Sequence, residues 1–152
     1  RILLIGETPL MASRFGQEIR GLGLNLRKMG VEVACLGFNY TGWPFRSDAV
    51  PYPLYPWMGS PASPENIEEV LNDFRPDTLI LIGPPVFFQW LRKFKKRKRY
   101  TVILHTAFRS TPISDYMRNT YGIADTIVVN SRYEERVLRE ELPGASIAFI
   151  SP

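Results

Sequence analysis

Short apolar runs, rich in β-branched residues, recur along the chain at wide intervals. The clearest are "ILLIG" (2–6), "TLILIG" (78–83), "TVILHT" (101–106) and "TIVVNS" (126–131), with "VEVACLGF" (31–38) and "ASIAFIS" (145–151) as two more. Each run is continuous rather than alternating, which is typical of strands that are covered on both faces in a parallel sheet. The pattern therefore predicts six strands of such a sheet.

Segments with helical periodicity separate these runs. Apolar residues recur at steps of three and four from Arg14 to Met29, and Gly30 follows as a helix stop. Another helix is predicted in "SRYEERVLREEL", where Ser131 stands three residues before Glu134 in the spacing of a capping box. The chain thus alternates between strand and helix patterns.

The stretch after the second apolar run is less regular. Residues 39–63 contain five prolines. They are predicted to form an ordered surface excursion with a short edge strand at Val50 to Leu54. A helix is expected to follow in "SPENIEEVLNDF", with Ser63 as its N-cap and Pro64 at its first helical position.

Alternating strands and helices predict right-handed crossovers and a Rossmann-like, doubly wound α/β sheet, mainly parallel, with helices on both faces. At 152 residues the chain has the size of one domain, so we expect residues 1–152 to form a single one. Ligands bind outside the carboxyl ends of the strands in such sheets. His105, the only histidine, ends a predicted central strand and therefore lies at the expected binding crevice.

The composition is that of an ordinary soluble protein, with 45% hydrophobic and 22% charged residues. No apolar run approaches the ~20 residues of a membrane span, and no signal peptide is visible. Cys35 is the only cysteine, so neither a disulfide framework nor a cysteine-rich metal site can be built. These features favour the cytoplasm. The chain begins at Arg1 without an initiator methionine, and we expect it to be part of a longer protein.

One segment, "RKFKKRKR", accounts for the net charge of +4, because the rest of the chain holds 12 basic and 15 acidic residues. Its basic residues are Arg92, Lys93, Lys95, Lys96, Arg97, Lys98 and Arg99. Apolar residues lie at the i, i+3, i+4 and i+7 positions of a helix over this region, namely Phe87, Trp90, Leu91 and Phe94. Such a basic amphipathic helix binds an anionic membrane surface or nucleic acid. Alternatively, its apolar side packs on the sheet and its cations are solvated.

The loop after the first run, "GETPLMASRFGQE", leads into a helix N-terminus, where backbone N–H groups could hold an anion or a phosphate. In the alternative interpretation Gly6 only ends a strand and Gly16 is a small residue in the first helical turn. "GLGLNL" lacks the third glycine of a dinucleotide fingerprint and falls inside a helix, which indicates packing. No P-loop motif is present.

Position alone leaves two interpretations of His105. A lone histidine at a strand end is often a hydrogen-bonded structural residue, and one histidine cannot form a histidine metal cluster. As a functional residue, it would donate a hydrogen bond to a sugar hydroxyl or a phosphate, with Arg109 and Ser110 in the following loop.

Taken together, these segments resemble the N-terminal domain of a GT-B glycosyltransferase. More narrowly, they are similar to the retaining group that contains sucrose synthases, mannosyltransferases and glycogen synthases. The resemblance covers nearly the whole chain and rests on the order of "RILLIGETP", "RFGQEIRGLGLNLRKMGVEVACLGF", "VILHT" and "IADTIVVNSRYEERVLREELPGASIAFISP". The first loop of that family often carries paired glycines, whereas "SRFGQE" has one.

That resemblance implies roles for individual residues. His105 would match the family's strand-end histidine, which hydrogen-bonds the donor sugar near the reaction centre, and is the candidate catalytic residue. The loop that approaches the donor phosphate would contain Arg14, Phe15 and Gly16. The acceptor wall would include Tyr40, Trp43 and Arg109.

The resemblance also implies a second, C-terminal domain that holds most of the nucleotide-sugar donor. The family's two glutamates, separated by seven residues, lie in that domain, and no glutamate pair here has this spacing. Stabilisation of the departing diphosphate would come chiefly from that domain. Residues 1–152 alone are therefore expected to be the acceptor-binding half of an enzyme and to be inactive by themselves.

No tightly bound cofactor and no metal are expected, and the nucleotide sugar is a substrate. The expected partners are the donor-binding domain, a sugar or lipid acceptor and an anionic membrane surface, with the protein peripheral on the inner face of the membrane. Nucleic acid is not an expected partner under this interpretation. The alternative is a stand-alone, non-catalytic α/β module that binds a nucleotide, a sugar or nucleic acid.

Overall fold

The computed structural model describes residues 1–46, 48–60, 63–95, 100–107 and 111–151. Seven of the strands in these ranges form one sheet. They are β1 (Ile2–Glu7), β2 (Val33–Phe38), β3 (Leu54–Pro56), β6 (Thr78–Ile82), β7 (Thr101–His105), β8 (Thr126–Val129) and β9 (Ile147–Phe149). Each of the six apolar runs of the sequence supplies one of these strands, as predicted.

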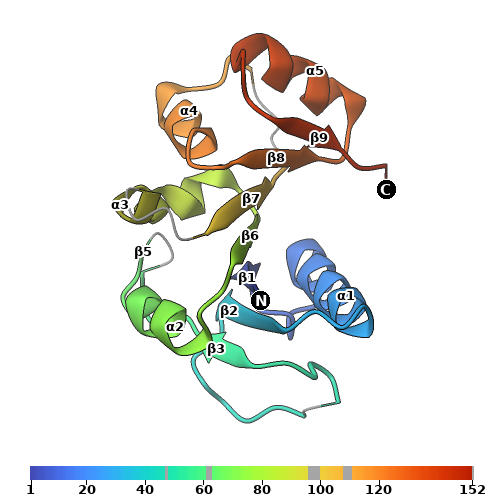
Figure 1. Ribbon diagram of the computed structural model, residues 1–152, viewed down its shortest axis with the longest axis vertical. Coiled ribbons are helices and arrows are strands. Elements are labelled where there is room, and N and C mark those ends of the chain that lie inside the picture. Colours follow the sequence, from blue (N-terminus) through green and yellow to red (C-terminus); the bar gives the residue numbers. More distant parts are fainter. Residues whose placement is uncertain (47, 61–62, 96–99, 108–110, 152) are drawn as a thin grey trace.

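Every pairing in this sheet is parallel, and the strand order is β3-β2-β1-β6-β7-β8-β9 (Figure 1). The chain builds from β1 to one edge and then returns to add strands on the other side of β1. The reversal between β1 and β6 is the topological switch point of a Rossmann-like sheet. The predicted doubly wound α/β fold is therefore confirmed.

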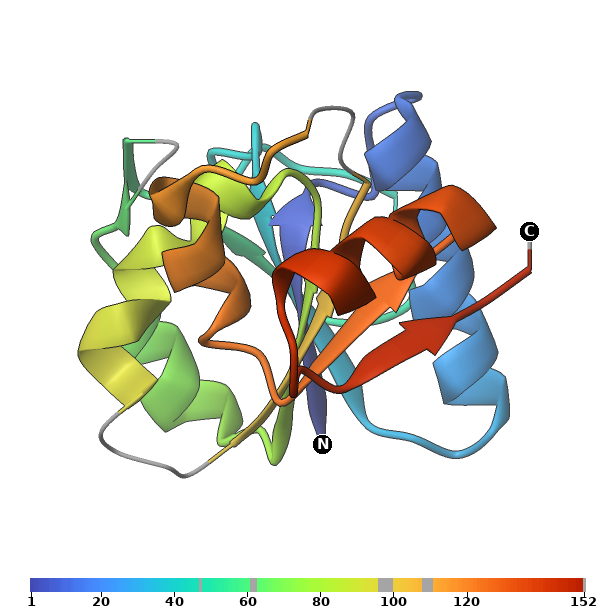
Figure 2. The ribbon, with the colours of Figure 1, turned by 90° about the horizontal axis from the view of Figure 1, so that it is seen from above.

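Helices cover both faces of the sheet. They are α1 (Arg14–Lys28), α2 (Ile67–Phe74), the 3₁₀ helix η1 (Pro85–Leu91), α3 (Arg92–Lys95), α4 (Asp115–Tyr121) and α5 (Arg132–Glu141). Figure 2 shows α1 on one side of the sheet and α2, α3 and α4 on the other. Helix α5 packs Val137 and Leu138 into the core on that second side. Within the described residues, no helix has the length and apolarity to cross a membrane.

Alternation along the strands divides the core into two clusters and decides where His105 points. In β7, Val102 and Leu104 belong to the cluster beneath α2, η1, α4 and α5, whereas Ile103 packs against the cluster beneath α1. Successive side chains of a strand point to opposite faces. His105 therefore lies on the α1 side, at the carboxyl end of its strand. Cys35 is fully buried in the α1-side cluster, and this burial raises the pKa of its thiol.

The two helices with the clearest sequence signals begin where they were predicted. The Ser13 side chain caps α1, and Gly30 beyond its end adopts a φ of 81°, which glycine tolerates without strain. The Ser131 side chain accepts a hydrogen bond from the Glu134 N–H at 3.1 Å, as the capping spacing predicts.

The predicted start of the next helix is wrong. Helix α2 begins at Ile67 rather than near Pro64, and Ser63–Pro64 instead form the short strand β5, paired with β4 (Gly59–Ser60). The cause is tertiary, because Asn66 donates to the Pro56 carbonyl at 2.8 Å and accepts from the Met58 N–H at 3.2 Å. These bonds tie the segment before α2 to the chain that leaves β3.

The predicted edge strand is present but begins later than expected. It is β3 at Leu54–Pro56, whereas Val50 and Tyr52, which precede it, are buried in the α1-side core. The Tyr52 hydroxyl donates to the Ile19 carbonyl at 3.5 Å. Tyr52 thus serves as a packing residue for α1 instead of a ladder residue.

In the described part of the predicted amphipathic α-helix, Pro85–Leu91 form a 3₁₀ helix and Arg92–Lys95 are α-helical. Three residues per turn place Phe88 and Leu91 on the same face. Both are buried, and Phe88 is not a residue that the α-helical spacing selected. Trp90 is also buried, so the apolar side of this segment packs on the sheet.

We predict opposite effects for the two glycines of "GLGLNL". A Cβ atom on Gly23 would lie 2.6 Å from the Tyr52 ring, whereas one on Gly21 would meet nothing within 4 Å. Gly23→Ala should lower the free energy of unfolding by about 1–3 kcal/mol, because the ring must move. Gly21→Ala should raise it by about 0.5–1 kcal/mol, because alanine is the better helix former. Urea unfolding followed by circular dichroism measures both, and equal effects would contradict the packing described.

Candidate functional site

The imidazole of His105 is held between two elements at the carboxyl edge of the sheet. Its Nε2 lies 2.9 Å from Oδ1 of Asn130, the residue that follows β8. Its Nδ1 lies 3.9 Å from Oε2 of Glu18, on α1. About 20% of the His105 side chain is exposed, so the ring is accessible but largely enclosed. The histidine thus joins the end of the neighbouring strand to the helix that begins after β1.

Glu18 is itself held in place by an ion pair within the helix. The Arg14 Nε donates to Glu18 Oε1 at 2.9 Å, one helical turn before it. The Arg14 guanidinium also lies over the Phe15 ring, 5.9 Å from its centroid. Arg14 was predicted to belong to the loop that approaches the donor phosphate, and in this structure its Nε binds the Glu18 carboxylate.

The first turn of α1 is anchored to the ends of β1 and β2 as well. The Ser13 hydroxyl accepts a hydrogen bond from the Gly16 N–H at 3.1 Å and donates one to Glu7 Oε2. The other Glu7 oxygen accepts from Asn39 Nδ2 at 3.4 Å. Glu7 ends β1 and Asn39 follows β2, so these contacts hold the helix start against two neighbouring strand ends.

Gly16 lies where its own loop leaves no room for a side chain. A Cβ atom there would be 2.6 Å from the Met11 carbonyl oxygen and 2.9 Å from that of Thr8. The glycine is buried, and its N–H is already bonded to the Ser13 side chain. Close packing therefore explains the residue type at this position.

The predicted acceptor wall is only partly accessible. Tyr40 is 6% exposed, and its hydroxyl donates to the Trp43 carbonyl at 3.1 Å. The rings of Tyr40 and Trp43 meet edge to face with centroids 4.9 Å apart, and Trp43 is 42% exposed. Trp43 thus offers an exposed aromatic surface, and the buried Tyr40 ring packs against it. Arg109 lies outside the described residues.

Sequence reasoning missed Glu18 and Asn130, the two residues in contact with the His105 ring. A signal existed for Asn130, because strand β8 pairs with β7 and the residue after its end must lie near His105. The sequence held no such signal for Glu18, since only the packing of α1 across the sheet brings it to β7. The predicted residues Gly16 and His105 do lie at the same edge, linked through the first turns of α1.

Only the start of the basic run lies within the described residues. Arg92 and Lys93 are exposed at the start of α3, and Lys95 ends this helix before β7 begins at Thr101. The side chain of Lys95 and residues Lys96, Arg97, Lys98 and Arg99 lie outside what the structure describes. β7 begins at Thr101, the end of the strand opposite to His105.

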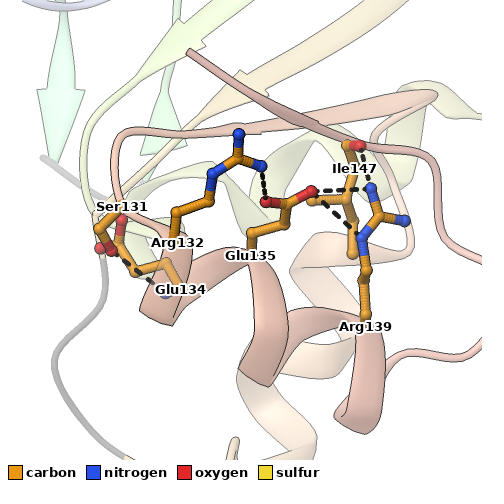
Figure 3. A network of polar contacts seen from close by, with 6 residues as sticks. All are labelled: Ser131, Arg132, Glu134, Glu135, Arg139 and Ile147. Carbon is orange, nitrogen blue, oxygen red and sulfur yellow. Dashed lines mark hydrogen bonds and ion pairs between the residues drawn. The ribbon is translucent and has the colours of Figure 1, made fainter. Parts of the chain in front are cut away.

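A separate ionic network fixes the last strand to the last helix (Figure 3). Glu135 accepts from Arg132 at 2.7 Å and from Arg139 at 3.0 Å, and Arg139 also donates to the Ile147 carbonyl at 3.1 Å. The Arg132 guanidinium stacks over Phe149, 3.9 Å from the ring centroid. Hydrogen bonds from these two arginines hold the pKa of Glu135 below its usual range.

In the part of the chain that is described, no three His, Cys, Asp or Glu side chains gather as metal ligands would. The site at the carboxyl edge consists instead of one imidazole, an amide and carboxylates held by a serine and an arginine. Hydrogen bonding, charge and proton positioning are the chemistry that such groups can supply.

The sheet order and the polar side chains at the switch-point edge define a Rossmann-like α/β domain. A family model described as Glycosyltransferase Family 4 matches residues 19–152. Because the match covers most of the chain, the chain belongs to this family, whose members are N-terminal domains of GT-B glycosyltransferases. The resemblance seen in the sequence is confirmed at this level. No curated protein matches the chain in sequence.

The Glu135 network generates a prediction on pH dependence. A carboxyl whose pKa is lowered by folding adds stability above its unfolded pKa, and this stability is lost as the pH falls through the folded value. In Glu135→Gln, unfolding midpoints should therefore fall less than in the wild type as the pH is lowered below the unfolded carboxyl pKa of about 4.3. Glu140→Gln on the same helix is the matched control. A wild-type acid dependence in Glu135→Gln would disprove the coupling.

Proposed function

We propose that this chain forms the acceptor-side domain of a glycosyltransferase that moves a sugar from a nucleotide-sugar donor to an acceptor with retention of configuration. Family membership supports the enzyme class. The carrying observation is the placement of His105 beside the first turns of α1, through Glu18, at the carboxyl edge of a parallel sheet. In doubly wound sheets that edge is where ligands bind.

Each group at this edge has a proposed task. The largely enclosed His105 ring hydrogen-bonds the donor sugar near the reacting carbon. Trp43 presents an apolar ring face on which an acceptor can rest, because an aromatic body contributes contact area and excludes water. The first turn of α1, which contains Gly16, lies next to the donor phosphate. Arg14, whose Nε binds Glu18, acts there through the remaining nitrogens of its guanidinium.

The test is a transfer assay of the full-length protein with a panel of radiolabelled nucleotide sugars and lipid or oligosaccharide acceptors. His105→Ala should lower kcat/KM by about 10–100-fold, which is the loss of one hydrogen bond to a charged transition state. Met29→Ala, an exposed position at the far end of α1, should leave kcat/KM unchanged. Full activity of His105→Ala would refute the role of the ring.

Two controls sharpen this assay. Residues 1–152 alone are expected to give no transfer, because the charges that stabilise the departing diphosphate are assigned to the donor-binding domain. The anomeric proton of the product, read by NMR, reports retention or inversion, and an inverted product would remove the retaining assignment. Binding of the sugar without any turnover would favour a non-catalytic module.

The basic run is proposed to hold the enzyme at an anionic membrane surface. The exposure of Arg92 and Lys93 supports this proposal. The apolar side chains of Trp90 and Leu91 are buried in the core and do not reach the surface. Attachment would therefore be electrostatic, without insertion of this segment into the hydrocarbon. Salt weakens electrostatic attachment, because it shortens the Debye length over which the charges attract one another.

Co-sedimentation with phosphatidylserine-containing vesicles tests this attachment. Reversal of charge at Arg92 and Lys93 should weaken binding about tenfold or more, at ~1 kcal/mol for each charge near the surface. The matched control reverses Arg27 and Lys28, an exposed basic pair at the end of α1. Binding that survives high salt, or that falls equally in both variants, would rule the proposal out.

A further inference from the structure

The two ring nitrogens of His105 face groups of different chemistry. Nε2 is 2.9 Å from Oδ1 of Asn130, and a half-turn of this side-chain amide would present its NH₂ group to the ring instead. Nδ1 is 3.9 Å from the Glu18 carboxylate, which when ionised can only accept. This second distance exceeds hydrogen-bond length, so the contact in this structure is electrostatic.

The Glu18 carboxylate is incompletely satisfied on the side that faces the ring. Its Oε1 accepts from Arg14 at 2.9 Å. Its Oε2 is buried and accepts no hydrogen bond from any residue that the structure describes. A buried acceptor without a donor is costly, and such groups in folded proteins usually have a specific reason. This oxygen lies 3.9 Å from Nδ1 of His105.

We propose that Glu18 is a positioning residue for His105 and keeps the ring proton on Nδ1. An unprotonated Nδ1 would direct its lone pair at a carboxylate, which is repulsive. A protonated Nδ1 directs a positive hydrogen at it. Asn130 adapts to either state of Nε2 by turning its amide, so the carboxylate and not the amide decides where the proton resides. The position of the proton does not depend on the proposed function, but its role in sugar transfer rests on that function.

The consequence for the site is a division of labour between the two nitrogens. Nδ1 pairs with Glu18. At Nε2, a sugar hydroxyl takes the place of Asn130 as the hydrogen-bond partner. Glu18 in turn is fixed by Arg14, so a chain of contacts runs from the first turn of α1 to the ring. Any movement of that turn changes the orientation of the imidazole.

The single histidine makes this proposal directly testable in the chain as it stands. Long-range ¹H–¹⁵N NMR of the ¹⁵N-labelled protein distinguishes the two neutral tautomers at the alkaline end of a pH titration, and with one histidine no assignment is needed. The wild type should show the hydrogen on Nδ1. In Glu18→Ala it should move to Nε2, where the Asn130 oxygen accepts it.

Two further variants complete the design. Glu18→Gln keeps an acceptor at the same place and should retain most of the Nδ1–H form, which also covers the case of an alanine variant that fails to fold. Glu32→Ala removes the same charge before the start of β2, at the other edge of the sheet, and should leave the ring spectrum unchanged. An Nε2–H ring in the wild type, or one tautomer shared by the wild type and Glu18→Ala, would overturn the proposal.

The ring spectrum is independent of any transfer assay, so the two proposals fail separately. If Glu18→Ala changes the tautomer but the protein shows no transfer activity, the proposed pairing of Glu18 with His105 is supported and the proposed enzymatic role is refuted. In an active full-length enzyme, Glu18→Ala should lower kcat about tenfold with a smaller change in KM, and Glu18→Gln should recover part of that loss.

Discussion

The site depends on the close approach of α1 to the centre of the sheet at Gly6. A Cβ atom at this position would lie 2.4 Å from the Ile82 carbonyl oxygen and 2.7 Å from Cδ1 of Ile19. No other residue type allows β1, β6 and α1 to meet so closely. Because Ile19 is the next residue after Glu18, this contact also sets how far the carboxylate reaches toward β7. The glycine before the last residue of β1 therefore determines the geometry one turn into the helix.

From that contact, the start of α1 is held on two sides. Glu7 and Asn39 bind it through Ser13 on the side of β1 and β2, and Glu18 faces His105 on the side of β7 and β8. Glu7 and His105 end parallel strands, Asn39 follows one, and Ser13 and Glu18 lie at the start of the helix after β1. Because the carboxyl ends of parallel strands meet at one edge, the sheet collects these groups there.

Local signals in the sequence predicted most of the elements. Continuous apolar runs became the strands, and Ser131 caps α5 as its spacing predicted, because a cap is formed by residues that are neighbours in the chain. The failures have nonlocal causes. The segment at Ser63 pairs with β4 instead of capping α2, and Phe88 is buried because a 3₁₀ turn meets the sheet.

The same distinction separates what the sequence by itself determined from what only the tertiary structure decided. Apolar periodicity determined the order of elements, the parallel sheet and the position of His105 at a strand end, since each depends on neighbours in the chain. The partners of the imidazole were decided by packing. Glu18 is 87 residues away from His105 along the chain, and only the crossing of α1 over the sheet brings its carboxylate to the ring.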